Sequence, residues 1–140
     1  MAADTRATVE TEAGGIRLMR CEKLYRLDDA IIGVAGEGFP GLVFVEWYRA
    51  RLTKPEPPEL LIHGDADFSA LVLTRSGLYE FDKWCRPERV LNRFWAIGSG
   101  AKAALGAMHA GSNAFCAARI ACKIDPLCGT PIVTMTLKKR

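Results

Sequence analysis

The sequence predicts an α+β fold in which helices cover antiparallel strands. The order of elements carries this prediction: strands come first, followed by a helix, a strand hairpin, two helices and a final strand. The helices fall between hairpins and do not alternate with single strands, which favours α+β layers over a parallel βαβ fold. With 140 residues and no internal repeat, the chain is expected to form a single domain spanning residues 1–140.

The first half of the chain contains two strands and a helix. A strand is expected around Lys23–Leu27, and the two aspartates that follow it favour a turn. Ala30–Ala35 is a continuous apolar run with two isoleucines and a valine, which indicates a buried strand. Apolar residues recur at helical spacing from Phe39 to Leu52, with Pro40 in the first turn, where proline is tolerated.

The second half begins with a linker and a hairpin. Thr53–Glu59 holds three prolines and is expected to be extended. Phe68–Thr74 and Leu78–Phe81 then form two strands joined by a turn that contains Gly77. A further short strand is expected at Phe94–Ile97.

Two helices and a strand complete the chain. The segment from Gly100 to Ala110 is rich in alanine and glycine, so this helix can pack very close to its neighbour. Ser112 is expected to cap a helix over 113–124, and Ile132–Leu137 alternates like a strand.

Composition excludes several classes of function. Apolar residues make up 49% of the chain and charged residues 25%, and the net charge of +3 is too small to indicate nucleic-acid binding. No apolar run approaches the ~20 residues needed to cross a membrane, and no signal peptide opens the chain, so a cytoplasmic protein is expected. The spacing of the five cysteines fits neither a zinc motif nor a disulfide framework, which predicts reduced thiols and neither metal nor cofactor.

Five short signatures follow one another in a fixed order. They read AADTR at 2–6, EKLYRL at 22–27, GVAG at 33–36, AIGSG at 96–100 and DPLCG at 125–129. Together they resemble the proteasome β-subunit family, which includes the HslV-type peptidases and shorter phage-like relatives and belongs to the N-terminal-nucleophile hydrolases. The resemblance runs from Met1 to about Leu137.

The resemblance implies a fold, an activity and partners. The fold would be a four-layer αββα sandwich, with two antiparallel sheets face to face and helices on both outer faces. The activity would be that of a threonine-type peptidase, whose nucleophile is the first residue of the mature chain. The partners would be a peptide or unfolded-protein substrate, copies of the same chain in a ring and an ATP-dependent unfoldase, without nucleic acid or membrane.

The family roles fall on five residues of this chain. Asp4 would pair with Lys23, which tunes the threonine amine and hydroxyl, and the backbone N–H of Gly36 would bind the oxyanion. Ser99 would lie beside the threonine amine and join its hydrogen-bond network, and Asp125 would converge with the other four residues on one cleft at the end of the sandwich. Taken alone, these residues also suit plainer roles: a solvated acid, a surface lysine, a glycine needed for backbone shape, a helix cap and a helix-ending turn.

Cys128 stands where the family often has a serine. A thiol donates and accepts hydrogen bonds only weakly, so the second hydroxyl of the family site has no full counterpart here. Cys128 is not expected to replace the nucleophile, because His63 and His109 form no pattern that would support it.

The family nucleophile has no counterpart in the 140 residues. The sequence reaches Asp4 after three residues, so the strand that would carry the threonine is expected upstream of Met1, and the chain as given is expected to be inactive. Thr5 is not expected to take this role, because trimming the chain to Thr5 would remove Asp4. A non-catalytic ring subunit and an N-terminal-nucleophile amidase acting on a small amide remain alternatives.

Overall fold

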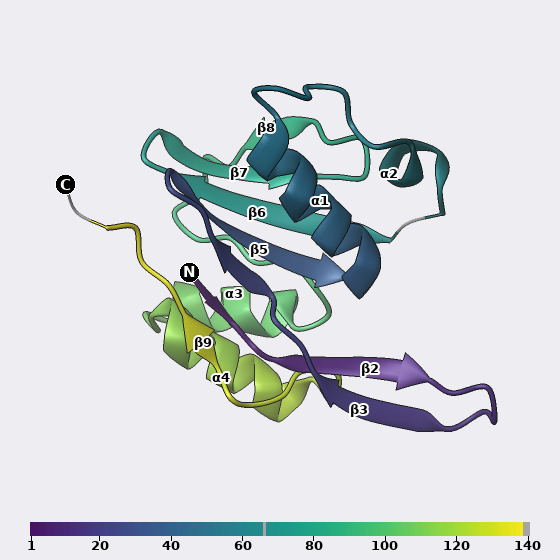
Figure 1. The fold of residues 1–140 in the computed structure, drawn as a ribbon. Helices are drawn as coiled ribbons and strands as arrows, with labels where there is room; N and C mark the ends of the chain where they lie inside the picture. Colours follow the sequence, from purple (N-terminus) through teal and green to yellow (C-terminus); the bar gives the residue numbers. More distant parts are fainter. Residues whose placement is uncertain (66, 139–140) are drawn as a thin grey trace. The chain divides into compact units, whose positions relative to one another are not determined.

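The computed structural model describes residues 1–65 and 67–138, and the chain divides into two compact units (Figure 1). The first unit consists of Met1–Leu24 and Phe94–Met135, and the second of Tyr25–Arg93 with the segment that begins at Thr136. Each unit combines antiparallel strands with helices, as the α+β prediction requires. Among the described residues, none of the helices has the length and apolar character that crossing a membrane requires.

A five-stranded sheet forms the second unit. Its order is β4 (Leu24–Arg26), β5 (Ala30–Gly36), β6 (Phe68–Thr74), β7 (Gly77–Phe81) and β8 (Pro87–Arg89). The pairs from β5 to β8 are antiparallel, with Ile32 opposite Val72 and Val72 opposite Tyr79. The first four residues of β5 are all buried, as the continuous apolar run predicts.

Helix α1 (Gly38–Ala50) packs on β5 and β6 and supplies the centre of the core. Phe44 is fully buried, and its ring centroid lies 5.7 Å from that of Phe68 and 5.2 Å from that of Phe81. The short helix α2 (Glu59–His63) contacts α1 and adds the buried Leu61 to this core. The sequence analysis did not predict α2, because three nearby prolines indicate an extended segment.

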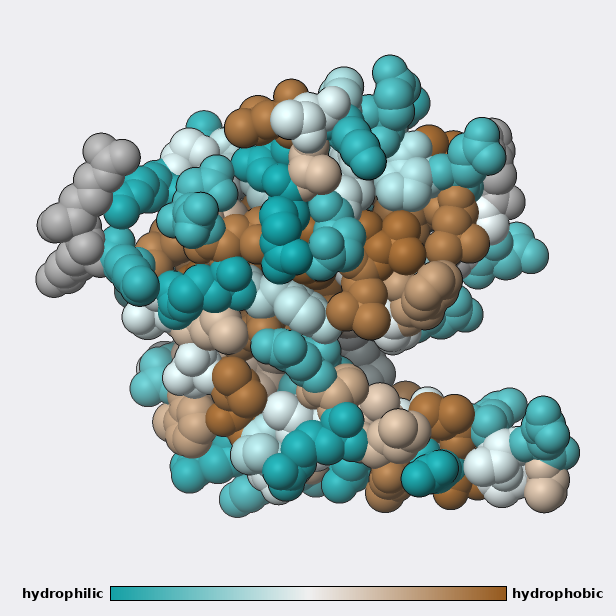
Figure 2. All heavy atoms as spheres, in the orientation of Figure 1, coloured by the Kyte–Doolittle hydropathy of each residue, from teal (hydrophilic) through white to brown (hydrophobic). Residues whose placement is uncertain are grey.

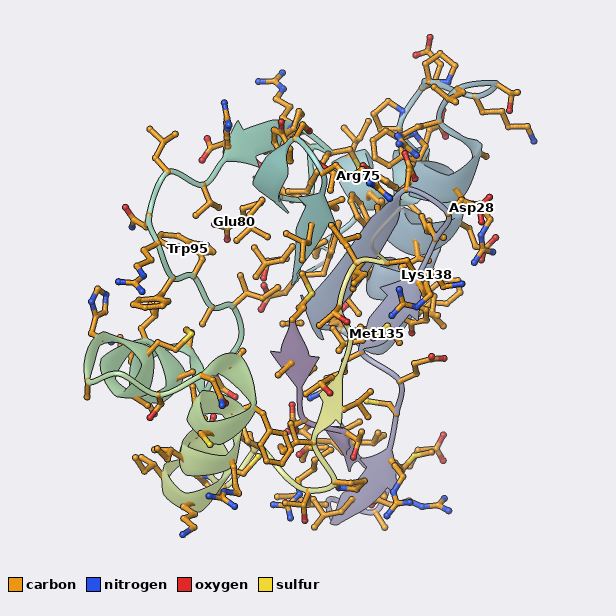
Figure 3. The ribbon with its side chains drawn as sticks, turned by 90° about the vertical axis from the view of Figure 1, so that its left-hand side faces the viewer. Asp28, Arg75, Glu80, Trp95, Met135 and Lys138 are labelled. Carbon is orange, nitrogen blue, oxygen red and sulfur yellow. The ribbon has the colours of Figure 1, made fainter. Side chains whose placement is uncertain are left out.

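The end of the chain is bound to the second unit by two arginines. The Arg26 guanidinium donates to the carbonyl oxygen of Thr136 at 3.0 Å, and the Arg75 guanidinium donates to that of Lys138 at 3.1 Å. Arg75 and Lys138 are both labelled in Figure 3. Side-chain hydrogen bonds therefore hold this segment, which does not add a strand to the sheet.

The first unit contains two strand pairs and two helices. Its elements are β1 (Ala2–Ala3), β2 (Arg6–Glu10), β3 (Ile16–Arg20), α3 (Ala101–His109), α4 (Ala114–Ile124) and β9 (Val133–Thr134). The strand β1 pairs with β9, and β2 pairs with β3, both antiparallel. Helices α3 and α4 pack against each other through small residues, with Ala117 and Ala121 buried.

The β2–β3 hairpin is the least covered part of the first unit. All five residues of β3 are exposed, and apolar side chains (brown) lie among polar ones on the surface over the hairpin (Figure 2). Ile16 and Leu18 are 72% and 59% exposed.

Three local predictions were wrong or only partly right. Phe94–Ile97 forms no strand in the described chain, and Phe94 instead packs edge-on against His109 with ring centroids 5.6 Å apart. The cap of α4 is Asn113 and not Ser112, because the Asn113 side chain accepts the Cys116 N–H at 2.9 Å. The final strand is shorter than predicted and covers Val133–Thr134.

Candidate active site

An ion pair lies at the centre of the candidate site in the first unit. Asp4 lies between β1 and β2, and Lys23 directly precedes β4. The Lys23 Nζ is 2.8 Å from Asp4 Oδ1, and the two side chains are 22% and 13% exposed. Partial burial makes this pair less open to screening by salt than an ordinary surface pair.

Backbone groups hold the second oxygen of the same carboxylate. Asp4 Oδ2 accepts the N–H of Arg6 at 3.1 Å and the N–H of Gly129 at 2.9 Å. With Lys23, three donors converge on one carboxylate, which fixes its orientation. Asp4 is therefore not a freely solvated acid.

A pocket of about 240 Å³ opens beside this pair. Its lining residues all come from the first unit and are Ala3, Asp4, Thr5, Arg20, Cys21, Glu22, Lys23, Leu24 and Val133. The pocket gives the Asp4–Lys23 pair a hollow in which a reacting group could lie.

The turn after α4 contains a second polar cluster. Asp125 accepts the Leu127 N–H at 2.9 Å and the Cys128 thiol at 3.3 Å. The pKa of Asp125 is lowered by its hydrogen bond with Ser99 first, and then by the bonds from Leu127 and Cys128. Burial, and next the bond to Asp125, raises the pKa of the Cys128 thiol to about 11, so this thiol is protonated at neutral pH.

The turn connects the two clusters. The Gly129 N–H reaches Asp4, and the Arg6 guanidinium donates to the Pro126 carbonyl at 2.9 Å from the β2 side. The structure therefore brings Asp4, Lys23, Ser99 and Asp125 into one connected region of the first unit. The N-cap position of α3 is occupied by Gly100, and no side chain caps the helix. The expectation that Ser99 could serve as a helix cap is therefore wrong.

Gly36 lies at the end of β5 in the second unit. Its φ of 94° belongs to the region that favours glycine, and an added Cβ would collide with the carbonyl of Asp67. The adjacent Glu37 N–H donates to the same Asp67 carbonyl at 2.7 Å. Backbone shape alone therefore accounts for a glycine at this position.

Thr5 is unsuited to act as a nucleophile. Its residue is only 7% exposed, and its hydroxyl donates to the Pro131 carbonyl at 3.0 Å. Its backbone N–H is bound to the Gly129 carbonyl at 3.1 Å. Thr5 therefore joins β1 and β2 to the segment that follows α4.

Two residues of the site were missed by sequence reasoning, namely Arg6 and Gly129. Arg6 packs across Gly129 so closely that a Cβ on this glycine would overlap the guanidinium. Both lie inside the quoted signatures, at the ends of AADTR and DPLCG, and this position was the only signal available in the sequence.

The region supplies charge and hydrogen bonding, but the described residues supply no hydroxyl joined to a free α-amine. The α-amine at Met1 donates to the Met135 carbonyl at 2.8 Å, and burial lowers its pKa. Lys23 and Asp4 could set the local charge around a nucleophile placed in the adjoining pocket.

Comparisons with known proteins identify the fold. No protein-family model matches the sequence, and the search of curated proteins gives no significant match. Among solved structures, HslV from Trypanosoma brucei is similar at a TM-score of 0.72 and 22% identity, over 94% of this chain and 88% of that chain. BPH from Thiobacillus denitrificans, solved alone and in complex with epoxomicin, is similar at a TM-score of 0.68 and 20% identity, with the same shares covered. This chain therefore has the HslV fold, as its resemblance to the proteasome β-subunit family predicts.

Proposed function

We propose that this chain is the subunit of a threonine-type peptidase in a proteasome-like assembly. The observation that carries the proposal is the Asp4–Lys23 pair, held by the Gly129 N–H beside a pocket in a chain with the HslV fold. An ion pair fixed in this way can set the charge around a reacting amine and hydroxyl.

In the proposed reaction, an N-terminal threonine hydroxyl attacks the carbonyl carbon of a peptide bond. The α-amine of the same threonine takes the hydroxyl proton, because the ordinary pKa of such an amine lies near neutrality. Lys23 and Asp4 set the local charge around the threonine. The amine then protonates the leaving group, and water releases the acyl group from the threonine oxygen.

The threonine would come from a segment placed before Met1. Thr5 is bound to Pro131, and Cys128 is bound to Asp125 with its pKa raised, so neither supports an alternative nucleophile. The 140-residue chain is accordingly expected to lack peptidase activity.

The test compares the 140-residue chain with a form extended by a strand that begins with threonine. The extended form should cleave small fluorogenic peptides, and changing its first threonine to alanine should abolish cleavage. Lys23→Ala should lower the turnover number by about a hundredfold or more through loss of charge at the amine and hydroxyl. Lys102→Ala is the matched control, because Lys102 is an exposed lysine on α3 of the same unit.

Two results would overturn this mechanism. Turnover by the 140-residue chain that persists through purification would require another nucleophile. An extended chain that is folded and inactive would favour a non-catalytic ring subunit, which the replacement of a family serine by Cys128 also supports.

We further propose that the subunit forms a homo-oligomeric ring in the cytoplasm and receives peptides or unfolded proteins, with an ATP-dependent unfoldase as partner. The fold shared with HslV and the exposed apolar residues of the β2–β3 hairpin support association of copies.

A further inference from the structure

A row of hydroxyl groups lies at the turn between β6 and β7. The Thr74 hydroxyl is 2.8 Å from that of Ser76, and the Ser76 hydroxyl is 3.2 Å from that of Tyr79. The Thr74 hydroxyl donates its one proton to the Gly77 carbonyl at 3.1 Å, so Ser76 donates to Thr74 and Tyr79 donates to Ser76. Hydroxyl groups rotate, so the Ser76 and Tyr79 protons can turn instead to an acceptor that arrives from solvent.

Arg89 extends this row from the neighbouring strand. It stands opposite Tyr79 in the β7–β8 pair, and its guanidinium donates to the Ser76 carbonyl at 3.3 Å. The guanidinium also crosses Gly77, where an added Cβ would lie 3.4 Å from Arg89 Nε. Because a guanidinium carries five N–H donors and the Ser76 carbonyl takes one of them, others remain for a ligand.

The positive charge at this turn is not balanced by a carboxylate. In the part of the chain that the structure describes, Arg75 and Arg89 form no ion pair, whereas Arg51 of the same unit binds Asp29 at 3.2 Å. Arg75 lies within the turn, and its guanidinium donates to the Lys138 carbonyl at 3.1 Å. The end of the hairpin therefore gathers two cations and several hydrogen-bond donors, and the natural complement of such a group is an anion.

We propose that Ser76, Tyr79 and Arg89, with Arg75 beside them, form a binding site for a phosphate group. The planar fork of a guanidinium matches two phosphate oxygens at once. A phosphate has further oxygens that can accept from the two hydroxyls, whereas a carboxylate has only two oxygens in all. The chemistry is the same for free inorganic phosphate and for the phosphate of a small phosphomonoester.

The site is separate from the proposed peptidase chemistry. All four of its residues belong to the second unit, whereas the Asp4–Lys23 pair belongs to the first. A bound phosphate would join the β6–β7 turn to β8, a three-residue edge strand whose residues are all exposed. Because a ligand that binds only the folded state stabilises it, phosphate should also raise the unfolding temperature of this sheet.

The experiment titrates the 15N-labelled 140-residue chain with inorganic phosphate and, separately, with glycerol phosphate. Sodium chloride is exchanged for each anion so that the ionic strength stays constant. The backbone N–H signals of Ser76 and Gly77 and the Nε–H signal of Arg89 should shift and saturate together. Saturation by either anion supports the site, and tighter binding of glycerol phosphate assigns the phosphate to a larger ligand. The proposal is wrong if the shifts grow linearly without saturation for both anions.

Variants make the assignment specific. Arg89→Gln should weaken binding by about tenfold or more, because a hydrogen bond to a charged group is lost. Arg86→Gln is the matched control, since Arg86 is an exposed arginine just before the same strand, and it should leave binding unchanged. Equal weakening in both variants would reduce the effect to general positive charge and overturn the proposal. The titration of the wild-type chain decides the matter even if a variant fails to fold.

Discussion

At the scale of single residues, Asp4 is the side chain on which most of the site depends. It accepts hydrogen bonds from Lys23, Arg6 and Gly129, and it is only 13% exposed. Its removal would leave a partly buried ammonium and two N–H groups without their acceptor, which is costly for groups shielded from water.

Asp4→Ala should therefore lower the free energy of unfolding by about 1–3 kcal/mol in urea unfolding experiments. Asp29→Ala is the control, because Asp29 also forms an ion pair, with Arg51 at 3.2 Å, but is 65% exposed. An exposed pair contributes about 0–1 kcal/mol. Equal losses in the two variants would mean that the Asp4 network does not stabilise the first unit.

Gly36 offers a second test at this scale. Gly36→Ala places a Cβ against the Asp67 carbonyl at a φ of 94°, so it should lower the free energy of unfolding by about 1–3 kcal/mol. Gly106→Ala should instead leave stability unchanged or raise it by up to about 1 kcal/mol, since Gly106 lies in α3 with no neighbour near its Cβ. Thermal unfolding followed by circular dichroism measures both. A neutral Gly36→Ala would contradict the tight approach of β5 and Asp67.

At the scale of elements, helix α4 could be capped by either of two neighbouring residues, Ser112 or Asn113, and the sequence alone does not favour one over the other. Serine and asparagine are both good caps, and only the structure shows that the Asn113 side chain accepts the Cys116 N–H. Asn113→Ala should therefore lower the free energy of unfolding by about 1 kcal/mol, whereas Ser112→Ala should change it by a few tenths at most. The same loss from Ser112→Ala would place the cap one residue earlier.

The elements that the sequence predicted well have strong internal patterns. β5 is an unbroken apolar run, α1 has helical spacing with a proline in its first turn, and β6 and β7 flank a turn that contains Gly77. The misses are short segments whose state depends on partners far along the chain. Residues 94–97 are apolar but form no ladder, and Phe94 packs against His109 of α3. The strand β1 needs β9 as its partner.

Part of the candidate site could be predicted in the same way. The family signatures named Asp4, Lys23, Ser99 and Asp125, and the Asp4–Lys23 pair has the close contact that they imply. The Gly129 N–H bond to Asp4 could not be predicted, because it joins residues 125 positions apart and involves only a backbone group on one side. Arg6 was missed for a similar reason, since an arginine in a signature does not reveal that it reaches the Pro126 carbonyl.

At the scale of the whole molecule, the β2–β3 hairpin is the part of the first unit with the most uncovered apolar side chains. Val9, Ile16, Leu18 and Met19 are between 43% and 72% exposed on a ribbon of two strands. A two-stranded hairpin is marginally stable in water without further packing. The proposed association of copies would give this ribbon the packing that it lacks.

The proposed assembly should therefore depend on the hairpin. In the extended, threonine-bearing form, sedimentation at micromolar concentration should give a discrete oligomer, and Leu18→Lys should shift it toward smaller species, because a buried lysine loses its hydration. Leu52→Lys is the matched control: Leu52 is 91% exposed in the second unit, so the same change there should leave the oligomer intact. Circular dichroism of both variants checks that each is folded. A monomeric extended chain would contradict the ring, and an oligomer that tolerates Leu18→Lys would place the contact on another surface.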